Sequence, residues 1–204
     1  MSAVWQDIWS GLRSASWLDQ ANLLLGVAGV VLMIRRTLWA FPVGLVAVSV
    51  QGVLFYEARY YADATLQVIF FGALAYGWWH WVRGRGAAPE LPVTRLGWRA
   101  RLGLVAACLG ATLAWAWWLR AHTDAVMPFR DAFIASFSVA GQFLQARKKL
   151  ENWPCWTIAN VVAIASYWAG GLYYTSFLYA LYLGLGLTGW RAWARGGTGE
   201  RANA

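Results

Sequence analysis

The chain has 204 residues, of which 60% are hydrophobic and 13% are charged, and its mean hydropathy is +0.44. Soluble domains of this size are about half apolar and about a quarter charged, so this composition excludes a water-soluble globular enzyme. The net charge of +8 does not indicate a nucleic-acid partner, because so apolar a chain places its cations in loops beside a membrane. Two cysteines and two distant histidines form neither a metal-ligand spacing nor a disulfide framework, so we expect no metal and no cofactor.

A membrane span needs roughly 20 mostly apolar residues, because a helix rises about 1.5 Å per residue across a core of about 30 Å. The sequence predicts seven such helices, over residues 19–34, 38–56, 62–82, 102–119, 131–147, 154–170 and 173–193. Before them, Trp5, Ile8, Trp9 and Leu12 recur at helical spacing, which predicts a short interfacial helix in the first seventeen residues. A signal peptide is the alternative, but Asp7 lies where that segment would be basic.

Seven spans sort the cations very unequally between the two sides of the membrane. The side that holds the N-terminus carries four, Arg13, Arg59, Arg120 and Arg130. The other thirteen of the 17 lie on the opposite side, in the loops near 35, 83–101 and 147–149 and in the C-terminal tail. Cytoplasmic loops are enriched in Lys and Arg, so we expect the N-terminus outside and the C-terminus in the cytoplasm of a bacterial inner membrane protein.

An internal repeat appears when the chain is shifted by 112 residues, because 19–84 then aligns with 131–196 without a gap and with 18 identities in 66 positions. Chance similarity between two apolar stretches is the alternative, but it would not favour the matched Asp, Arg, Pro and Trp positions. The repeat divides the chain into an interfacial segment (1–18), a first three-helix bundle (19–84), a linker with the fourth helix (85–130), a second bundle (131–196) and a cytoplasmic tail (197–204).

The offset covers four spans, an even number, so both copies cross the membrane in the same direction. We therefore predict an all-α integral membrane fold with seven helices in a 3+1+3 parallel repeat. The SWEET sugar transporters have such a repeat, and parallel repeats place the substrate between the two halves near the middle of the membrane.

Polar and aromatic side chains inside the predicted spans should face the protein interior, because burying an unpaired polar group in lipid is costly. The candidates are Gln51, Asp63, Gln67, Ser138, Gln142, Gln145, Trp153, Trp156, Asn160, Tyr179 and Tyr182. Each has a purely structural alternative. Polar residues often join helices, Trp153 has the position of an interfacial anchor, and Asp63 suits a helix start. Pro42 and Pro154 are either first-turn prolines or paired hinges.

Uncharged amides beside Trp and Tyr indicate a flat, aromatic and weakly charged ligand, since an aromatic face attracts a delocalised cation. The spans contain no central relay of Asp, Glu or His for ion coupling, and the chain has no Walker A loop. A membrane enzyme or scaffold is disfavoured, because no catalytic constellation is evident.

Several runs of residues resemble the PnuC-type vitamin transporters. In the first half they are Pro42-x-Gly44, Tyr60-Tyr61-Ala62-Asp63-x-x-Leu66-Gln67 and Tyr76-Gly77-Trp78-Trp79-x-Trp81. The second half has the more specific run Ser138-x-x-x-Gln142-x-Leu144-x-x-Arg147-Lys148-x-x-Glu151-x-Trp153-x-x-Trp156-x-x-x-Asn160, followed by Gly189-Trp190-x-x-Trp193. The likeness covers residues 19–195.

The resemblance implies a seven-helix inner-membrane protein that takes up nicotinamide riboside passively, with a cytoplasmic kinase trapping the vitamin by phosphorylation. It implies substrate binding by Trp153, Trp156 and Asn160, and more loosely by Gln142 and Gln67. Relatives that carry thiamine, riboflavin or deoxynucleosides keep those substrates open, with thiamine first among them. The lipid bilayer is the expected surrounding partner, and the wide apolar belt would permit a homotrimer.

Overall fold

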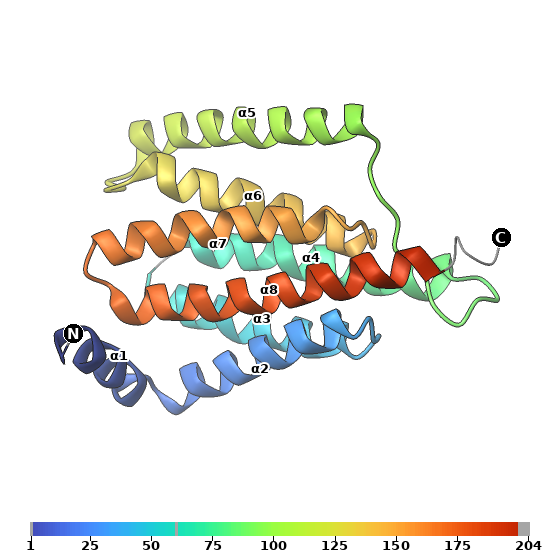
Figure 1. Ribbon diagram of the computed structural model, residues 1–204. Coiled ribbons are helices and arrows are strands. Elements are labelled where there is room, and N and C mark those ends of the chain that lie inside the picture. The colour runs from blue at the N-terminus through green and yellow to red at the C-terminus, as the bar shows by residue number, and fades with distance from the viewer. Residues whose placement is uncertain (1, 60, 200–204) are drawn as a thin grey trace.

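The computed structural model describes residues 2–59 and 61–199, and these residues form eight α-helices (Figure 1). They are α1 (Ser2–Ser14), α2 (Trp17–Ile34), α3 (Ala40–Glu57), α4 (Tyr61–Gly84), α5 (Trp98–His122), α6 (Pro128–Ala146), α7 (Asn152–Ala169) and α8 (Tyr173–Gly199). Each predicted helix is matched by one of them, although α5 begins earlier than expected because the arginines at its start lie within the helix. Three of the described helices, α2, α3 and α5, are long and apolar enough to cross a membrane by length and composition.

Six of these helices pack in a closed ring. The order around the ring is α2, α3, α4, α6, α7 and α8, and α8 packs back on α2. In Figure 1, α5 lies along the outer edge of the bundle beside α6, and α1 lies at the N-terminal end, where it packs on α8. The contact of α4 with α6 and that of α8 with α2 join the third helix of one half to the first helix of the other.

Two tryptophans 112 residues apart join the halves by equivalent hydrogen bonds. The indole Nε1 of Trp81, in α4, donates to the carbonyl of Ala146 in the last turn of α6, at 3.1 Å. The indole Nε1 of Trp193, in α8, donates to the carbonyl of Met33 near the end of α2, also at 3.1 Å. Carbonyls in the last turn of a helix have no partner within that helix, so each tryptophan satisfies one of them from the opposite half.

Four buried aromatic rings, Phe41, Trp81, Trp153 and Trp193, meet at this level and are called the aromatic cluster below. Phe41 packs edge-on against Trp81 at 5.1 Å between ring centroids, and Trp153 packs edge-on against Trp193 at 5.4 Å. Residues 41 and 153 are also equivalent at the offset of 112. Trp81 and Trp193 contact each other at 5.9 Å, so the cluster is continuous across the two halves.

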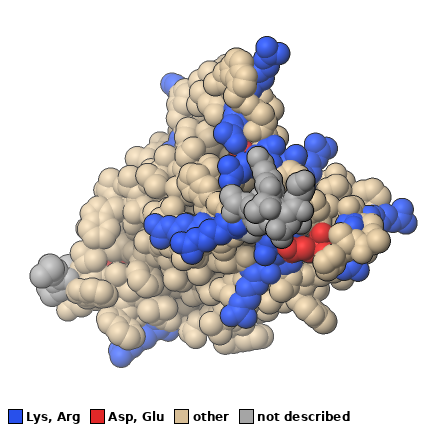
Figure 2. All heavy atoms as spheres, turned by 45° about the vertical axis from the view of Figure 1, so that its right-hand side comes forward, with Lys and Arg blue, Asp and Glu red and all other residues tan. Residues whose placement is uncertain are grey.

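The end of the bundle that carries the α2–α3, α4–α5 and α6–α7 connections is called the basic end. Figure 2 turns this end forward and shows Lys and Arg side chains gathered on it. The α4–α5 connection crosses it in an extended form, and the backbone of Thr94 accepts from Leu150 and donates to the carbonyl of Lys148. The Glu151 carboxylate accepts from the Leu96 amide at 3.0 Å and pairs with Arg101 at 2.8 Å. The connection is therefore tied to the start of α7.

Glu90, within this connection, binds both halves of the protein. Its two carboxylate oxygens lie 3.1 Å from Arg36 and 3.2 Å from Lys148, which are equivalent positions of the repeat. Arg36 and Lys148 have φ angles of 59° and 52°, in the left-handed region that favours glycine. Both residues directly follow the capping residue of a helix, α2 or α6, where a left-handed residue commonly ends the helix.

Prolines and glycines fall where the sequence placed them. Pro42 and Pro154 occupy the third positions of α3 and α7, as the first-turn interpretation predicts. The tight connection expected between the last two spans is confirmed, because α7 ends at Ala169 and Gly171 turns the chain with a φ of 74°.

Candidate functional site

The predicted stripe Trp153, Trp156 and Asn160 lies along one side of α7, starting at the basic end. Successive members are three and four residues apart, so Asn160 lies about 10 Å along the helix from Trp153. Trp153 is 2% exposed and Asn160 is 6% exposed, while Trp156 is half-buried. The three side chains are thus available at increasing depth within the protein, from the aromatic cluster inward.

Trp156 lies between α6 and α4. A methyl group at Gly141 would meet its indole ring at 3.1 Å, so this glycine lets the ring pack directly on the backbone of α6. On its other side, Phe70 of α4 approaches the ring edge-on at 6.2 Å between centroids. Phe70 belongs to the first half, so Trp156 lies at the contact between the halves.

Two uncharged amides accompany this tryptophan. Gln142 follows Gly141 on α6 and is 7% exposed, and Asn160 is one turn beyond Trp156 on α7. Buried amides seek hydrogen-bond partners, since leaving them unpaired costs free energy. The structure therefore brings together three of the predicted residues, Trp156, Asn160 and Gln142, at the α6–α7 contact.

Trp153 has a different environment, because its ring belongs to the aromatic cluster. A methyl group at Gly189 would overlap the Trp153 ring, so α8 passes directly against it. Its indole Nε1 and the hydroxyl of Thr157, one turn further along α7, are buried without a hydrogen-bond partner among the described residues. The helical spacing puts both polar atoms on the same side of α7, where a bound molecule or water would satisfy them.

Gln67 lies elsewhere, in a cavity of about 560 Å³ between α2, α3, α4 and α8 that α1 borders. In this cavity the Asn22 side-chain amide donates to Gln51 Oε1 at 2.6 Å. The Asn22 Oδ1 atom is buried with no partner among the described residues. Gln51 was among the predicted inward-facing residues, but Asn22 was not noticed, although an Asn inside an apolar helix is itself a signal of interior contact. The cavity lining includes no α7 residue, so Gln67 is not grouped with the Trp156 site.

Asp63 and Tyr179 lie toward the other end of the bundle, opposite the basic end. Tyr179 of α8 stacks on Tyr167 of α7 at 5.4 Å, and the Arg130 guanidinium lies 5.2 Å from the centre of the Tyr167 ring. Asp63 is exposed in the first turn of α4, where a carboxylate is favoured, and it is within electrostatic range of both tyrosines. These two predicted residues therefore contribute to a polar cluster near one mouth of the protein.

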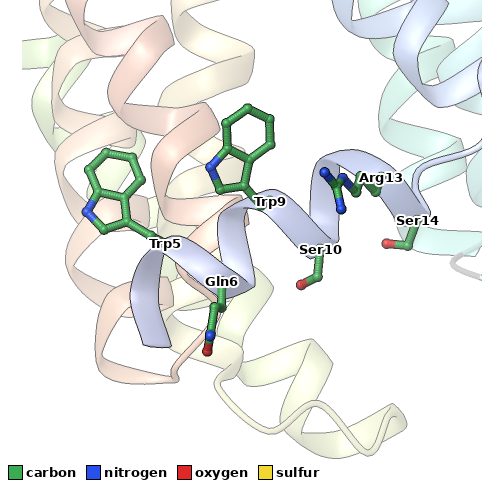
Figure 3. Close-up of a pocket in the computed structure, with 6 residues that line it drawn as sticks. All are labelled: Trp5, Gln6, Trp9, Ser10, Arg13 and Ser14. Carbon is green, nitrogen blue, oxygen red and sulfur yellow. The ribbon is translucent and has the colours of Figure 1, made fainter. Parts of the chain in front are cut away.

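The hollow along α1 has none of these features. Figure 3 shows Trp5 and Trp9 pointing to one side of this helix, with Gln6 and Ser10 on the other side. Both tryptophans are exposed, and α1 is held through Asp7, whose carboxylate accepts from the Tyr174 amide at the start of α8, at 3.1 Å. The exposed indoles suit the predicted interfacial location of α1, which stays a prediction.

The chemistry of the α6–α7 site is that of stacking and hydrogen bonding. An indole face can hold a planar ring, and the amides of Gln142 and Asn160 can each donate to and accept from polar groups on it. Within the described residues, no group of three or more His, Cys, Asp or Glu side chains could hold a metal ion. Such a site binds a flat, polar molecule by its faces and edges.

Comparisons with known proteins agree with this interpretation. The sequence profile of the family described as nicotinamide mononucleotide transporter matches residues 16–195. The riboflavin/roseoflavin transporter RibM of Streptomyces davaonensis is 29% identical over 183 residues, which are 87% of this chain and 84% of that protein. The nicotinamide riboside transporter PnuC of Escherichia coli is 27% identical over 212 residues, covering 91% and 88% of the two chains. The PnuC of Neisseria mucosa is 25% identical over 180 residues, covering 82% and 68%.

A solved structure shares the fold. The crystal structure of the vitamin B3 transporter PnuC superposes with a TM-score of 0.74 at 21% identity, over 97% of this chain and 89% of that one. The family profile covers nearly the whole chain, and both the relatives and the solved structure are transporters and not enzymes. The chain is therefore a multi-pass membrane protein that belongs to the nicotinamide mononucleotide transporter family, the family that includes the PnuC-type vitamin transporters.

Proposed function

We propose that this protein takes up nicotinamide riboside by facilitated diffusion, with the substrate held at the α6–α7 site. The observation that supports this most directly is the group formed by Trp156, Gln142 and Asn160, an indole with two buried uncharged amides at the contact between the halves. The nicotinamide ring would stack on the indole, and the amides would bond to its carboxamide or to the ribose. The unpaired polar atoms of Trp153 and Thr157 offer two further contacts.

The proposed mechanism is alternating access in a 3+1+3 parallel repeat of the SWEET type. The matched hydrogen bonds of Trp81 and Trp193 support a two-fold relation between the halves, because each joins equivalent elements. Two similar bundles that rock about a shared axis would open the site first to one side of the membrane and then to the other. Asp63 and Tyr179 would line the outer mouth, and the aromatic cluster would close the inner one. Gln67 would contact the substrate on its way in.

The proposed location is a bacterial inner membrane with the basic end in the cytoplasm. The cations gathered at that end support this orientation, since cytoplasmic loops are enriched in Lys and Arg. A cytoplasmic kinase would then phosphorylate the vitamin and prevent its return. A homotrimer is also proposed, and the mass of the protein purified in a mild detergent tests it.

Riboflavin is the second candidate substrate, and the similarity to RibM favours it. Thiamine and nucleosides follow it, because the same aromatic and amide side chains could hold them. A binding titration of the purified protein with nicotinamide riboside, riboflavin and thiamine separates these candidates. Tight binding of nicotinamide riboside alone is expected, and preferential binding of another ligand would replace the substrate but keep the site.

The site itself is tested by Trp156→Ala, with Trp117→Ala as the matched control. Trp117 lies on α5 and is 70% exposed, so its loss should leave ligand binding unchanged. Loss of binding in Trp156→Ala, with thermal stability kept near that of the control, is the expected result. Unchanged affinity in this variant would reject the α6–α7 site. Uptake that stops when proton and sodium gradients are collapsed, with the kinase active, would reject passive transport.

A further inference from the structure

A second cavity lies near the basic end, on the side of the bundle where α5 is placed. It measures about 370 Å³ and is lined by side chains of α5, α6, α7, α8 and the connection before α5. It exists because α5 packs mainly on α6, while its first turns stand opposite α7 and α8 without closing on them (Figure 1). The cavity is called the α5 crevice below. It is distinct from the proposed substrate site, since none of Trp156, Gln142 and Asn160 lines it.

The deeper wall of the α5 crevice is apolar. Leu104 and Val105 of α5 face Phe137 of α6 and Ile158 of α7, with Trp190 of α8 at the side. Val105 and Ile158 are among the exposed apolar residues, so this wall is not sealed by the protein itself. In a membrane the hydrocarbon chains of lipids are the apolar molecules that reach such a wall.

The mouth of the α5 crevice is cationic. Arg95 and Arg101 line it at the level of the basic end, together with Glu151. Glu151 pairs with Arg101 and also accepts the Leu96 amide, so one acidic group is shared between two donors. Arg95 is exposed, and the described residues include no acidic partner for it within ion-pair distance. Two cations against one carboxylate leave the mouth with a net positive charge.

We propose that the α5 crevice binds an anionic phospholipid of the leaflet at the basic end. The headgroup phosphate would lie between Arg95 and Arg101, and one acyl chain would lie along Val105 and Ile158. Basic pockets between membrane helices are the known physical basis for such recognition. A second copy of the same chain fits less well, because it would bring another strongly basic end of the same charge to this mouth.

The bound lipid would have a mechanical role as well. It would fill the space between α5 and the α7–α8 pair, and its headgroup would lie beside the Glu151 contacts that tie the α4–α5 connection to α7. The connection also carries Glu90, which binds both halves. Anionic lipid is therefore expected to stabilise the protein more than zwitterionic lipid of the same chain length.

The test measures lipid retention and stability and uses no substrate. The purified full-length protein is equilibrated with mixed micelles that contain either phosphatidylglycerol or phosphatidylcholine with identical acyl chains. Bound lipid is then counted by native mass spectrometry, and unfolding temperature is recorded in parallel. We expect retention of phosphatidylglycerol and a higher unfolding temperature with it.

Arg95→Gln is the diagnostic variant, and Arg99→Gln is its matched control. Arg99 lies four residues away on α5, stacks on Trp98 and does not line the crevice. Removing one basic residue near an anionic surface is expected to lower phosphatidylglycerol affinity about fivefold in Arg95→Gln, with the control within twofold of the unmodified protein. Equal retention of the two lipids by the unmodified protein would overturn the proposal, as would equal losses in the two variants.

A third variant tests the chain-binding wall. Val105→Trp places a bulky ring into the crevice but leaves both arginines in place, so it should displace the lipid and retain the folded state. Full retention of phosphatidylglycerol by Val105→Trp would exclude this crevice as its location. A protein assembly that is independent of lipid and is abolished by Val105→Trp would assign the crevice to a second copy and reject the lipid.

Discussion

Arg36 and Lys148, 112 residues apart in the chain, bind different oxygens of one carboxylate, that of Glu90. Lys148 is fully buried and also lies 4.3 Å from the centre of the Trp81 ring. Equivalent residues of the two halves thus meet at a group that belongs to neither half. A rocking motion that separates the halves at the basic end would stretch this contact first.

Glu90→Gln should therefore destabilise the protein. Removing one partner of a buried ion pair costs about 3–5 kcal/mol, but the Glu90 side chain is 43% exposed, so we expect about 1–2 kcal/mol. Thermal unfolding in detergent measures the change. The control is Glu57→Gln, at the exposed end of α3, which should unfold like the unmodified protein. Equal stability of the two variants would show that Glu90 does not hold the halves together.

The equivalence of Trp81 and Trp193 predicts equivalent effects. Trp81→Phe and Trp193→Phe each remove one hydrogen bond between the halves, worth about 1 kcal/mol, and each also loses some buried ring area. The double variant should depart from additivity because the two rings are in contact. Unfolding of the single and double variants, beside Trp117→Phe as an exposed control, checks both points. A large effect at one position and none at the other would contradict the two-fold relation.

Glycines under the aromatic cluster give a second stability test. In Gly77→Ala the added methyl group would lie 2.8 Å from the Phe41 ring, and in Gly189→Ala it would overlap Trp153. Overpacking of this kind costs about 1–3 kcal/mol. Gly103→Ala on α5 has open space around the new methyl group, so it should be neutral or should stabilise the helix by up to about 1 kcal/mol. The order of unfolding temperatures of these three variants is the measurement.

Gln142→Leu should weaken substrate binding without unfolding the protein. The substitution keeps a buried side chain of similar size but removes hydrogen bonds worth about 1–3 kcal/mol, so the dissociation constant should rise about fivefold to a hundredfold. Titration with nicotinamide riboside measures it, with Gln6→Leu on the exposed side of α1 as the control. A dissociation constant that matches the control would remove Gln142 from the site.

The helices could be predicted from the sequence because long apolar runs and matched repeat positions leave few alternatives. The ends of the helices were nearly right for the same reason, since Pro42, Pro154 and Gly171 mark turns by their own backbone chemistry. The α4–α5 connection could not be predicted, because it has no periodicity and its backbone pairs with Thr94 and Lys148 only in the folded bundle.

The site was predicted in part. A stripe at helical spacing correctly implied that Trp156 and Asn160 share one side of a buried helix. Spacing gave no information on which helix faces that stripe, so the packing of Trp153 on Trp193 was not foreseen. The repeat alignment contained the missing signal, because it pairs Trp153 with Phe41, another ring of the same cluster. Asn22 was missed because attention went to residues that resembled the family.

The bond from Trp193 to Met33 also has a consequence for synthesis of the chain. The ribosome completes Met33 160 residues before it adds Trp193, so α2 enters the membrane long before its partner exists. Contacts between residues so far apart in sequence form late, because the intervening chain must first be ordered. The first three-helix bundle therefore waits, with the last turn of α2 unfinished, until nearly the whole polypeptide has emerged.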